Sequence, residues 1–231
     1  MHLQVTHLQK EFKDKVVLQD LSFEIESGTV CGLLGVNGAG KSTLMKILFG
    51  LEQADKGQVL MDGRLLNKDK DRGRLLGALI ERPAIYQNLS AFDNLKTKAL
   101  LYGISDERIW EVLRTIGLSD TGKKRAKAFS LGMKQRLGIG MAILTEPAFL
   151  ILDEPTNGLD PDGIKDLLQL IRILKEKQMT ILVSSHQLHE VSQVADQILI
   201  LHQGRICYDR KSHQEDDLEQ LFFHIVHGGV R

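Results

Sequence analysis

A glycine-rich segment near the N-terminus has the residue types that hold a polyphosphate. It matches the pattern G-x-x-x-x-G-K-[ST] with the residues Gly35, Val36, Asn37, Gly38, Ala39, Gly40, Lys41 and Ser42. Glycines let backbone N–H groups turn inward around a phosphate, and the N-terminus of a following helix attracts the same anion. Lys41 can reach the β- and γ-phosphates, the Ser42 hydroxyl can bind Mg²⁺, and Thr43 completes the predicted ATP-binding set. A chance match in a glycine-rich turn is the alternative, and the apolar run before the loop disfavours it.

Two acidic residues form a second candidate site, because they follow an apolar run. Residues 149–152 are typical of a buried strand, and Asp153 and Glu154 come directly after them. Ligands of α/β folds bind at the C-terminal edge of parallel strands. Asp153 is therefore placed to hold Mg²⁺ through its water shell, and Glu154 to act as general base on the attacking water. Acids also end strands simply because water solvates them there, but the continuation 155–160 argues against that alternative.

Hydrophobic periodicity predicts the strands that must position these groups. Leu21, Phe23 and Ile25 alternate with polar residues, as in a half-buried strand. Asp62-Gly63 and Gln203-Gly204 are turn signals between short strands. The other predicted strands are 30–34, 58–61, 64–66, 75–80, 149–152, 180–184, 197–201 and 205–208.

Helices are expected between these strands. Residues 42–49 follow the glycine-rich loop, and Gly50 is placed to end that helix. The composition of 90–141 shifts toward helix, and we interpret about 88–142 as an inserted helical subdomain rather than a separate domain. An amphipathic stripe over 164–174 gives a β-α-β unit, and a short helix is expected at 216–226. The prediction is one α/β domain over residues 1–231.

The composition is that of an ordinary globular chain and excludes several classes of protein. Its 231 residues include 30 basic and 30 acidic side chains, so no nucleic-acid partner is expected from long-range charge. Apolar runs such as 75–80 fall short of the roughly 18–20 residues that span a bilayer. The N-terminus lacks the pattern of a signal peptide. Cys31 and Cys207 build no disulfide framework and fit a reduced, cytosolic compartment.

Four further segments complete a family pattern in order along the chain. They contain the aromatic Phe12, the signature-like residues Ser130, Leu131, Gly132 and Met133, the loop ending at Asp160, and His186 after a predicted strand. With the two sites above, the chain resembles the ATPase subunit of ATP-binding cassette (ABC) transporters over nearly its whole length. The resemblance implies a P-loop NTPase cassette. Such a cassette has a RecA-like parallel-sheet core, an antiparallel β-subdomain and an inserted α-helical subdomain.

The resemblance implies a role for each segment. Phe12 would stack on adenine, for which the alternative is a buried strand aromatic. Ser130 would cap the following helix and, with the rest of 130–133, contact the γ-phosphate bound to a second copy of the chain. Two chains would thus enclose two ATP molecules, with Asp160 in the D-loop. His186 would contact the γ-phosphate and orient the water, whereas a lone histidine is more often structural.

Two residues depart from the family pattern. Leu131 stands where the family has the first glycine of its signature, and Glu81 stands where it generally has a glutamine. Both glutamine and glutamate offer an oxygen to Mg²⁺ or water, so Glu81 is included among the predicted metal ligands. The change is either a near-isosteric replacement or the mark of a subfamily. With residues 130–138, Glu81 resembles the ATPases of lantibiotic self-immunity and bacitracin-type peptide-resistance transporters.

This resemblance implies an ATPase that uses ATP and Mg²⁺, forms an ATP-dependent homodimer and works with separate membrane permeases. The implied cargo is an antimicrobial peptide, expelled at the membrane of a Gram-positive bacterium, with this chain on its cytoplasmic side. One alternative is the ATPase of a small-solute importer or drug exporter. Another is a non-transport ABC ATPase that acts on ribosomes or DNA, which the single cassette without a heptad run disfavours. A P-loop kinase gives no reason for His186 together with the signature-like segment and the D-loop.

Overall fold

A six-stranded sheet forms the centre of the computed structural model, in which residues 1–13, 15–66, 72–211 and 218–228 are described. In sheet order its strands are β10 (Arg205–Lys211), β9 (Gln197–His202), β3 (Val30–Leu34), β8 (Thr180–Ser185), β7 (Phe149–Leu152) and β6 (Leu76–Leu79). All neighbours pair in parallel except β10 with β9. All of β7 is buried, and its side chains enter two different apolar clusters, so both faces of the sheet are covered. The predicted parallel-sheet core is confirmed.

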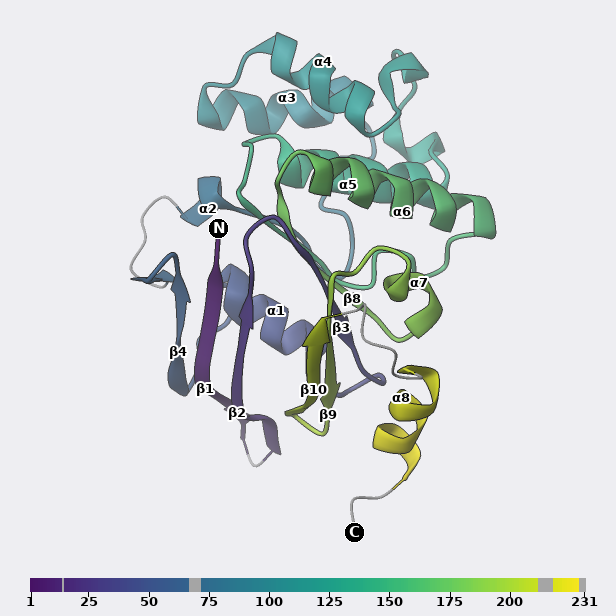
Figure 1. Cartoon of the computed structure of the whole chain (residues 1–231). Helices are drawn as coiled ribbons and strands as arrows, with labels where there is room; N and C mark the ends of the chain where they lie inside the picture. Colours follow the sequence, from purple (N-terminus) through teal and green to yellow (C-terminus); the bar gives the residue numbers. More distant parts are fainter. Residues whose placement is uncertain (14, 67–71, 212–217, 229–231) are drawn as a thin grey trace.

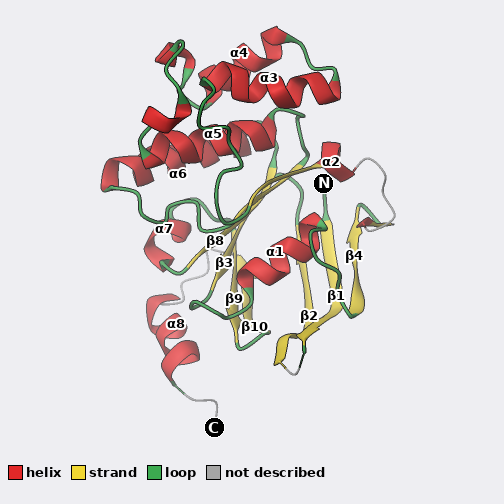
Figure 2. Cartoon of the chain, turned by 180° about the vertical axis from the view of Figure 1, so that it is seen from behind, coloured by secondary structure: helices red, strands yellow, loops and turns green. Residues whose placement is uncertain are grey.

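A second, antiparallel sheet lies beside the core. Its order is β2 (Lys15–Ile25), β1 (Leu3–Phe12), β4 (Lys56–Met61) and β5 (Arg64–Leu65). The predicted turn between β4 and β5 is present, with φ of 47° at Asp62 and 75° at Gly63. Helix α1 (Lys41–Phe49) runs between the two sheets and shares one apolar cluster with both (Figures 1 and 2). The start of α1 is therefore held by packing on two sides.

Strand β1 escaped sequence analysis because its side-chain alternation changes phase. Leu3 and Val5 are buried in one phase, whereas Leu8 and Lys10 are buried in the other. The shift coincides with a break in register beyond Val5 and with a φ of 51° at His7. Such a bulge hides the period of two that identifies a strand.

Helices α3 (Ala91–Tyr102), α4 (Asp106–Thr115) and α5 (Leu131–Ile143) build the helical region that was predicted at 90–141 (Figure 1). Ser90 caps α3 by accepting a hydrogen bond from the Asp93 N–H. Helix α4 buries Ile109, Val112 and Leu113 on one face, and α5 contacts α6 (Pro161–Glu176). Helix α6 fills the predicted β-α-β unit between β7 and β8.

Three short helices refine the predicted boundaries. Helix α2 (Arg72–Leu75) precedes β6, so the predicted strand at 75–80 is shorter than expected. Helix α7 (Leu188–Ser192) was not predicted, because five residues are too few to show a helical period. Helix α8 (Leu218–His227) supports the predicted C-terminal helix, although positions 216 and 217 lie outside the described residues. It packs Leu218 and Phe222 against β9 and α7.

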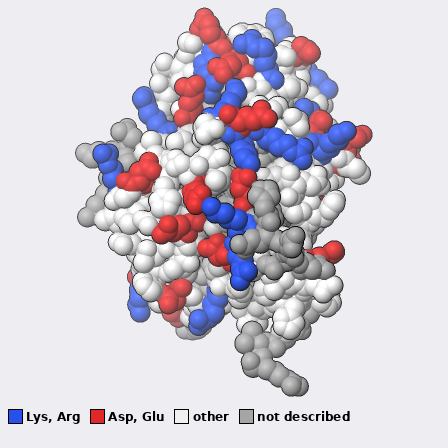
Figure 3. Space-filling model, in the orientation of Figure 1, with Lys and Arg blue, Asp and Glu red and all other residues white. Residues whose placement is uncertain are grey.

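The surface carries both signs of charge. Basic and acidic side chains are intermingled over the face seen in Figure 3. Within the described part of the chain, no helix combines the length and apolar character needed to cross a bilayer.

Candidate nucleotide site

The glycine-rich loop joins β3 to α1 and leaves the start of the helix open. Gly38 and Gly40 adopt φ of 82° and 111°, which favours glycine at both positions. At Gly35, a Cβ would lie 2.5 Å from the backbone oxygen of Leu201, so only glycine fits that close approach. No side chain caps the first turn of α1, and that turn holds no acid. Its N–H groups are therefore available to an anion.

Lys41, the first residue of α1, points into this loop. Its Nζ donates to the backbone oxygen of Gly35 at 2.7 Å and lies 3.0 Å from Oε1 of Glu154. The lysine is 5% exposed. A buried ammonium needs such partners, and these oxygens hold the charge at the loop. The structure thus joins the two candidate sites that the sequence predicted separately.

Ser184 on β8 fixes the two acids that follow β7. Its hydroxyl donates to Oδ1 of Asp153 at 2.7 Å and accepts from the backbone N–H of Glu154 at 2.8 Å. Glu154 adopts a φ of 44°, a left-handed conformation that non-glycine residues adopt at some cost. The two acids therefore sit in a turn that is held from the neighbouring strand.

His186 follows β8 and reaches the same carboxylate. Its Nδ1 lies 3.3 Å from Oε2 of Glu154, and its side chain is 37% exposed. The turn around it is closed by a hydrogen bond from the Gln187 N–H to the Ser185 hydroxyl. Lys41, Glu154 and His186 thus form one connected group of titratable side chains at the ends of β3, β7 and β8.

A pocket of about 670 Å³ opens next to this group and is lined by residues from four segments of the chain. It is lined by Asn37, Ser42, Glu81, Arg82, Pro83, Ile85, Gln87, Leu131, Lys134, Gln135, Asp153, Glu154 and Asn157. The predicted magnesium ligands Ser42, Asp153 and Glu81 are all among them. Gln135 is 6% exposed, and its Oε1 has no hydrogen-bond partner among the described residues. This buried oxygen can therefore accept a hydrogen bond from a ligand or a water.

The signature-like segment forms the first turn of α5. Ser130 is the N-cap, as predicted, and its hydroxyl accepts from the Met133 N–H at 3.2 Å. Leu131 is 46% exposed, and a Cβ built on Gly158 would lie 3.2 Å from its Cδ2. The leucine therefore lies against the loop that ends at Asp160. Asp160 in turn caps α6 by accepting from the Gly163 N–H at 2.9 Å.

Phe12, the predicted adenine-stacking residue, ends β1 and is 43% exposed. The alternative of a buried strand aromatic is therefore wrong. Lys10 Nζ lies 4.8 Å from the centroid of the ring, within the range of a cation–π contact. Lys10 is itself paired with Glu52 at 3.0 Å. The stacking of adenine on Phe12 stays a prediction.

Glu81 is held by a lysine of the phosphate-loop helix. Its Oε1 lies 2.6 Å from Lys46 Nζ, and its side chain is 63% exposed. The hydrogen bond and charge of Lys46 lower the pKa of this carboxyl below its ordinary value. Glu81 has a φ of 64° and follows β6. The structure thus adds Lys46, which the sequence motifs did not single out, to the surroundings of the site.

Sequence analysis also missed Ser184, Thr156 and Glu190. Thr156 donates to Oε2 of Glu190 on α7 at 2.5 Å, and both residues are buried. The only signal in the sequence that could have indicated these two residues was their proximity to predicted site residues. Thr156 lies two positions after Glu154, and Glu190 lies four positions after His186. Contacts between residues about thirty positions apart depend on the pairing of β7 with β8, which a local pattern does not contain.

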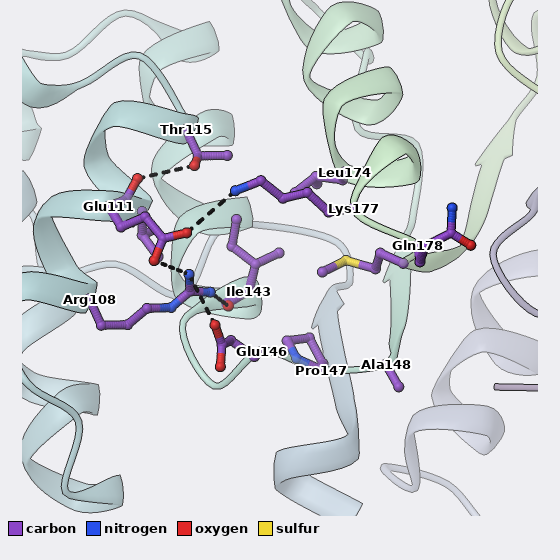
Figure 4. Close-up of a pocket in the computed structure, with 12 residues that line it drawn as sticks. Arg108, Glu111, Thr115, Ile143, Glu146, Pro147, Ala148, Leu174, Lys177 and Gln178 are labelled. Atoms are coloured by element: carbon purple, nitrogen blue, oxygen red, sulfur yellow. Dashed lines mark hydrogen bonds and ion pairs between the residues drawn. The ribbon is translucent and has the colours of Figure 1, made fainter.

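A second hollow, of about 280 Å³, lies where α4 meets the ends of α5 and α6 (Figure 4). Arg108 donates to the backbone oxygens of Ile143 at 3.0 Å and Leu144 at 3.4 Å, which end α5. Its guanidinium also lies 2.8 Å from Glu111, which reaches Lys177 at 3.4 Å (Figure 4). These ion pairs and hydrogen bonds join α4 to the ends of α5 and α6, and they thereby anchor the helical region to the core.

The fold and the site together define a P-loop NTPase whose sheet carries an inserted helical region and an antiparallel sheet. The chain belongs to the ABC transporter family, whose model matches residues 18–157. It is therefore the ATP-binding subunit of an ABC transporter and an ATPase.

Named relatives and solved structures agree with this assignment. The chain is 43% identical over 220 residues to the "Lantibiotic transport ATP-binding protein SrtF" of Streptococcus pyogenes, with 95% of each chain covered. It is 43% identical over 207 residues to the "Bacitracin transport ATP-binding protein BcrA" of Bacillus licheniformis, covering 88% of this chain and 68% of that protein. A solved "ATP binding subunit of ABC transporter" is 33% identical, with a TM-score of 0.81 and coverage of 97% and 95%. The predicted resemblance is confirmed at the level of the family and of these relatives.

Proposed function

We propose that the chain powers the expulsion of an antimicrobial peptide through separate permease chains. Support comes from the relatives named for lantibiotic and bacitracin transport, each 43% identical to this chain. A second candidate is a drug exporter, which is favoured by the "Linearmycin resistance ATP-binding protein LnrL" of Bacillus subtilis, 35% identical over 209 residues. By the same likeness, the chain works on the cytoplasmic side of the cell membrane of a Gram-positive bacterium.

In this proposal the linked group of Lys41, Glu154 and His186 carries out hydrolysis. The loop 35–40 and the start of α1 bind the phosphates through backbone N–H groups. Lys41 moves from Glu154 to the β- and γ-phosphates. Glu154 then accepts the proton of the attacking water, and His186 orients that water from the other side of the carboxylate. The observation that carries this assignment is that Glu154 contacts Lys41 and His186 at once, at 3.0 and 3.3 Å.

The donor set of the pocket fits Mg²⁺. Ser42, Asp153 and Glu81 offer oxygens, which Mg²⁺ prefers, and one or two carboxylates with substrate phosphates are its usual protein environment. The described residues contain no cluster of three or more His, Cys, Asp or Glu that could hold a metal on its own. The ion would accordingly arrive with the nucleotide. When bound, it would neutralise charge on the β- and γ-phosphates.

A second copy of the chain would complete each site. The N-terminus of α5 is capped by Ser130, and Leu131 beside it is half-exposed. Backbone N–H groups at such a helix start bind an anion. In the homodimer, residues 130–133 would face the γ-phosphate held by the partner, with Asp160 in the loop between the two sites.

An apolar groove offers a contact surface for the permeases. It has a volume of about 390 Å³ and lies between β6, α3 and α5, with Arg82, Lys98 and Tyr102 among its lining residues. Leu100 and Leu101 on α3 are 70% and 84% exposed. Extended apolar surface of the kind that this groove offers is typical of protein-interaction sites. The groove also borders the segment that contains Glu81, so a docked permease segment would sense changes at the site.

The proposal is tested by protection of a peptide-sensitive Gram-positive host. The chain is expressed with the permease genes that neighbour it, and the minimal inhibitory concentrations of lantibiotics, bacitracin and linearmycin are compared. Protection against the peptides that is lost in Glu154→Gln supports peptide expulsion. Protection against linearmycin alone supports the drug exporter. Equal protection by the Glu154→Gln variant would show that hydrolysis is not what powers it.

A further inference from the structure

A buried hydrogen bond ties the loop after Glu154 to the helix after His186. The Thr156 hydroxyl donates to Oε2 of Glu190 at 2.5 Å. Thr156 is 8% exposed and Glu190 6%. Among the described residues, the Thr156 hydroxyl is the one group that donates a hydrogen bond to the Glu190 carboxylate. The contact joins two segments that each carry one residue of the proposed hydrolytic group.

Helix α7, which carries Glu190, is firmly seated on the core. A Cβ built on Gly32 of β3 would lie 2.1 Å from Cγ1 of Val191, so α7 rests directly on the backbone of the sheet. Val191 also belongs to a buried cluster with Ile198 and Ile200 of β9. Helix α7 contacts both β8 and β3. Because α7 is held in place by this packing, Glu190 holds its partner Thr156 in a defined position.

Two tethers consequently flank His186. Before it, Ser184 bonds Asp153 and the backbone of Glu154; after it, Glu190 bonds Thr156. His186 itself is partly exposed and meets Glu154 only at 3.3 Å. Its distance from Glu154 thus depends on how firmly the segments are held together.

The chemistry of the pair indicates a positioning role rather than a packing role. A buried carboxylate loses hydration, and one neutral hydroxyl restores only part of that loss. Two apolar side chains would fill the same space without this loss. We propose that Glu190 is a positioning residue, which acts through Thr156 to keep the imidazole of His186 at the carboxylate of Glu154. This inference rests on the proposed roles of Glu154 and His186.

Matched variants separate the hydrogen bond from the packing. Thr156→Val removes the hydroxyl at nearly constant volume, and Thr156→Ser keeps it. Glu190→Gln keeps an oxygen that accepts the bond. Thr156→Val with Glu190→Met replaces both partners by apolar groups, which preserves stability where the single change leaves a carboxylate unpaired.

Turnover and nucleotide affinity give the first readout. In Thr156→Val and in the double variant, we expect kcat to fall about tenfold, which is less than the roughly 10²- to 10⁴-fold contribution of a positioned general base, because both catalytic side chains remain present. The KM for ATP should stay near its original value, because the phosphate loop is untouched. Thr156→Ser and Glu190→Gln should restore kcat. A double variant that folds normally and retains full kcat would overturn the proposal.

The second readout does not depend on turnover. With ¹³C-labelled histidine, the His186 ring resonance is identified by its loss in His186→Gln and then followed without nucleotide. We expect it to shift in Thr156→Val and in the double variant, and to return in Thr156→Ser. An unmoved resonance in both would refute the tether. Full turnover by His186→Gln would instead refute the proposed role of His186, while the resonance would still report on the tether.

Discussion

Replacement of Glu154 by glutamine should separate two functions of this carboxylate. Glu154 is the proposed base, and it is also the ion-pair partner of Lys41, at 3.0 Å. In the proposed mechanism, ATP recruits the same lysine to its phosphates. The glutamine side chain has nearly the same shape but no negative charge. The variant should therefore bind ATP more tightly while losing hydrolysis.

The magnitude of the first effect follows from the environment of the pair. The side chains of Lys41 and Glu154 are 4% and 21% exposed. At this separation and an effective dielectric constant near 20, the gross attraction is about 5 kcal/mol. Lost hydration and side-chain freedom offset most of it, which leaves about 1 kcal/mol net. Removal of that competition should lower the Kd for ATP about fivefold.

The magnitude of the second effect follows from the proposed chemistry. A positioned general base contributes about 10²- to 10⁴-fold to the rate, so kcat should fall by at least about 10²-fold. Equilibrium binding of a fluorescent ATP analogue and single-turnover hydrolysis measure the two effects on the same sample. Glu176→Gln, an exposed carboxylate at the end of α6, provides the control with the same chemical change.

Either half of this prediction can fail by itself. An unchanged Kd in Glu154→Gln would mean that the ion pair does not compete with ATP for Lys41. Hydrolysis at the original rate would remove Glu154 from the role of base. A similar gain in affinity by Glu176→Gln would show that general charge, and not the contact with Lys41, changes ATP binding.

Four further predictions concern binding, stability, coupling and pH dependence. Lys41→Ala should abolish measurable nucleotide binding in an equilibrium titration, and unchanged affinity would remove Lys41 from the site. Arg108→Met should lower the free energy of unfolding by about 2 kcal/mol in urea, because the charged hydrogen bonds at the end of α5 are lost while the stem still packs. Glu81→Ala should reduce transport more than hydrolysis in reconstituted vesicles, and equal losses would indicate a catalytic role. Because Lys46 lowers the pKa of Glu81, their contact should persist at neutral pH and break only as the pH falls through that lowered value, which ¹³C NMR of the carboxyl can follow.

The sequence alone was sufficient to predict where the glycine-rich loop and the acids at the end of β7 lie. The loop 35–42 and the acids after β7 are local patterns whose geometry is determined by a strand, a turn and a helix start. Their positions could therefore be predicted before any tertiary contact was known. The same holds for the turn at Asp62-Gly63, where positive φ is a local requirement.

The side-chain contacts that connect these groups could not be predicted. Glu154 meets Lys41 because β3 and β7 both pair with β8, which lies between them in the sheet, so the loops at their C-terminal ends lie close together. Lys46 meets Glu81 because α1 packs beside β6. Neither contact leaves a period or spacing in the sequence, since the partners are separated by whole elements. Strand β1 was missed for the opposite reason, as its bulge disrupts a local period that would otherwise be visible.

These contacts also bear on how nucleotide could change the shape of the site. Two lysines beside the phosphate loop are each held by a carboxylate: Lys41 by Glu154, and Lys46 by Glu81. The first pair is nearly buried and the second is exposed, so the second exchanges its partner more easily. A bound triphosphate would attract Lys41 directly and would weaken the hold of Lys46 on Glu81 through its charge. Glu81 follows β6, and the next residue, Arg82, lines the apolar groove beside α3 and α5. A change at the phosphates would thus reach the proposed permease surface through one short segment, without requiring a rearrangement of the core.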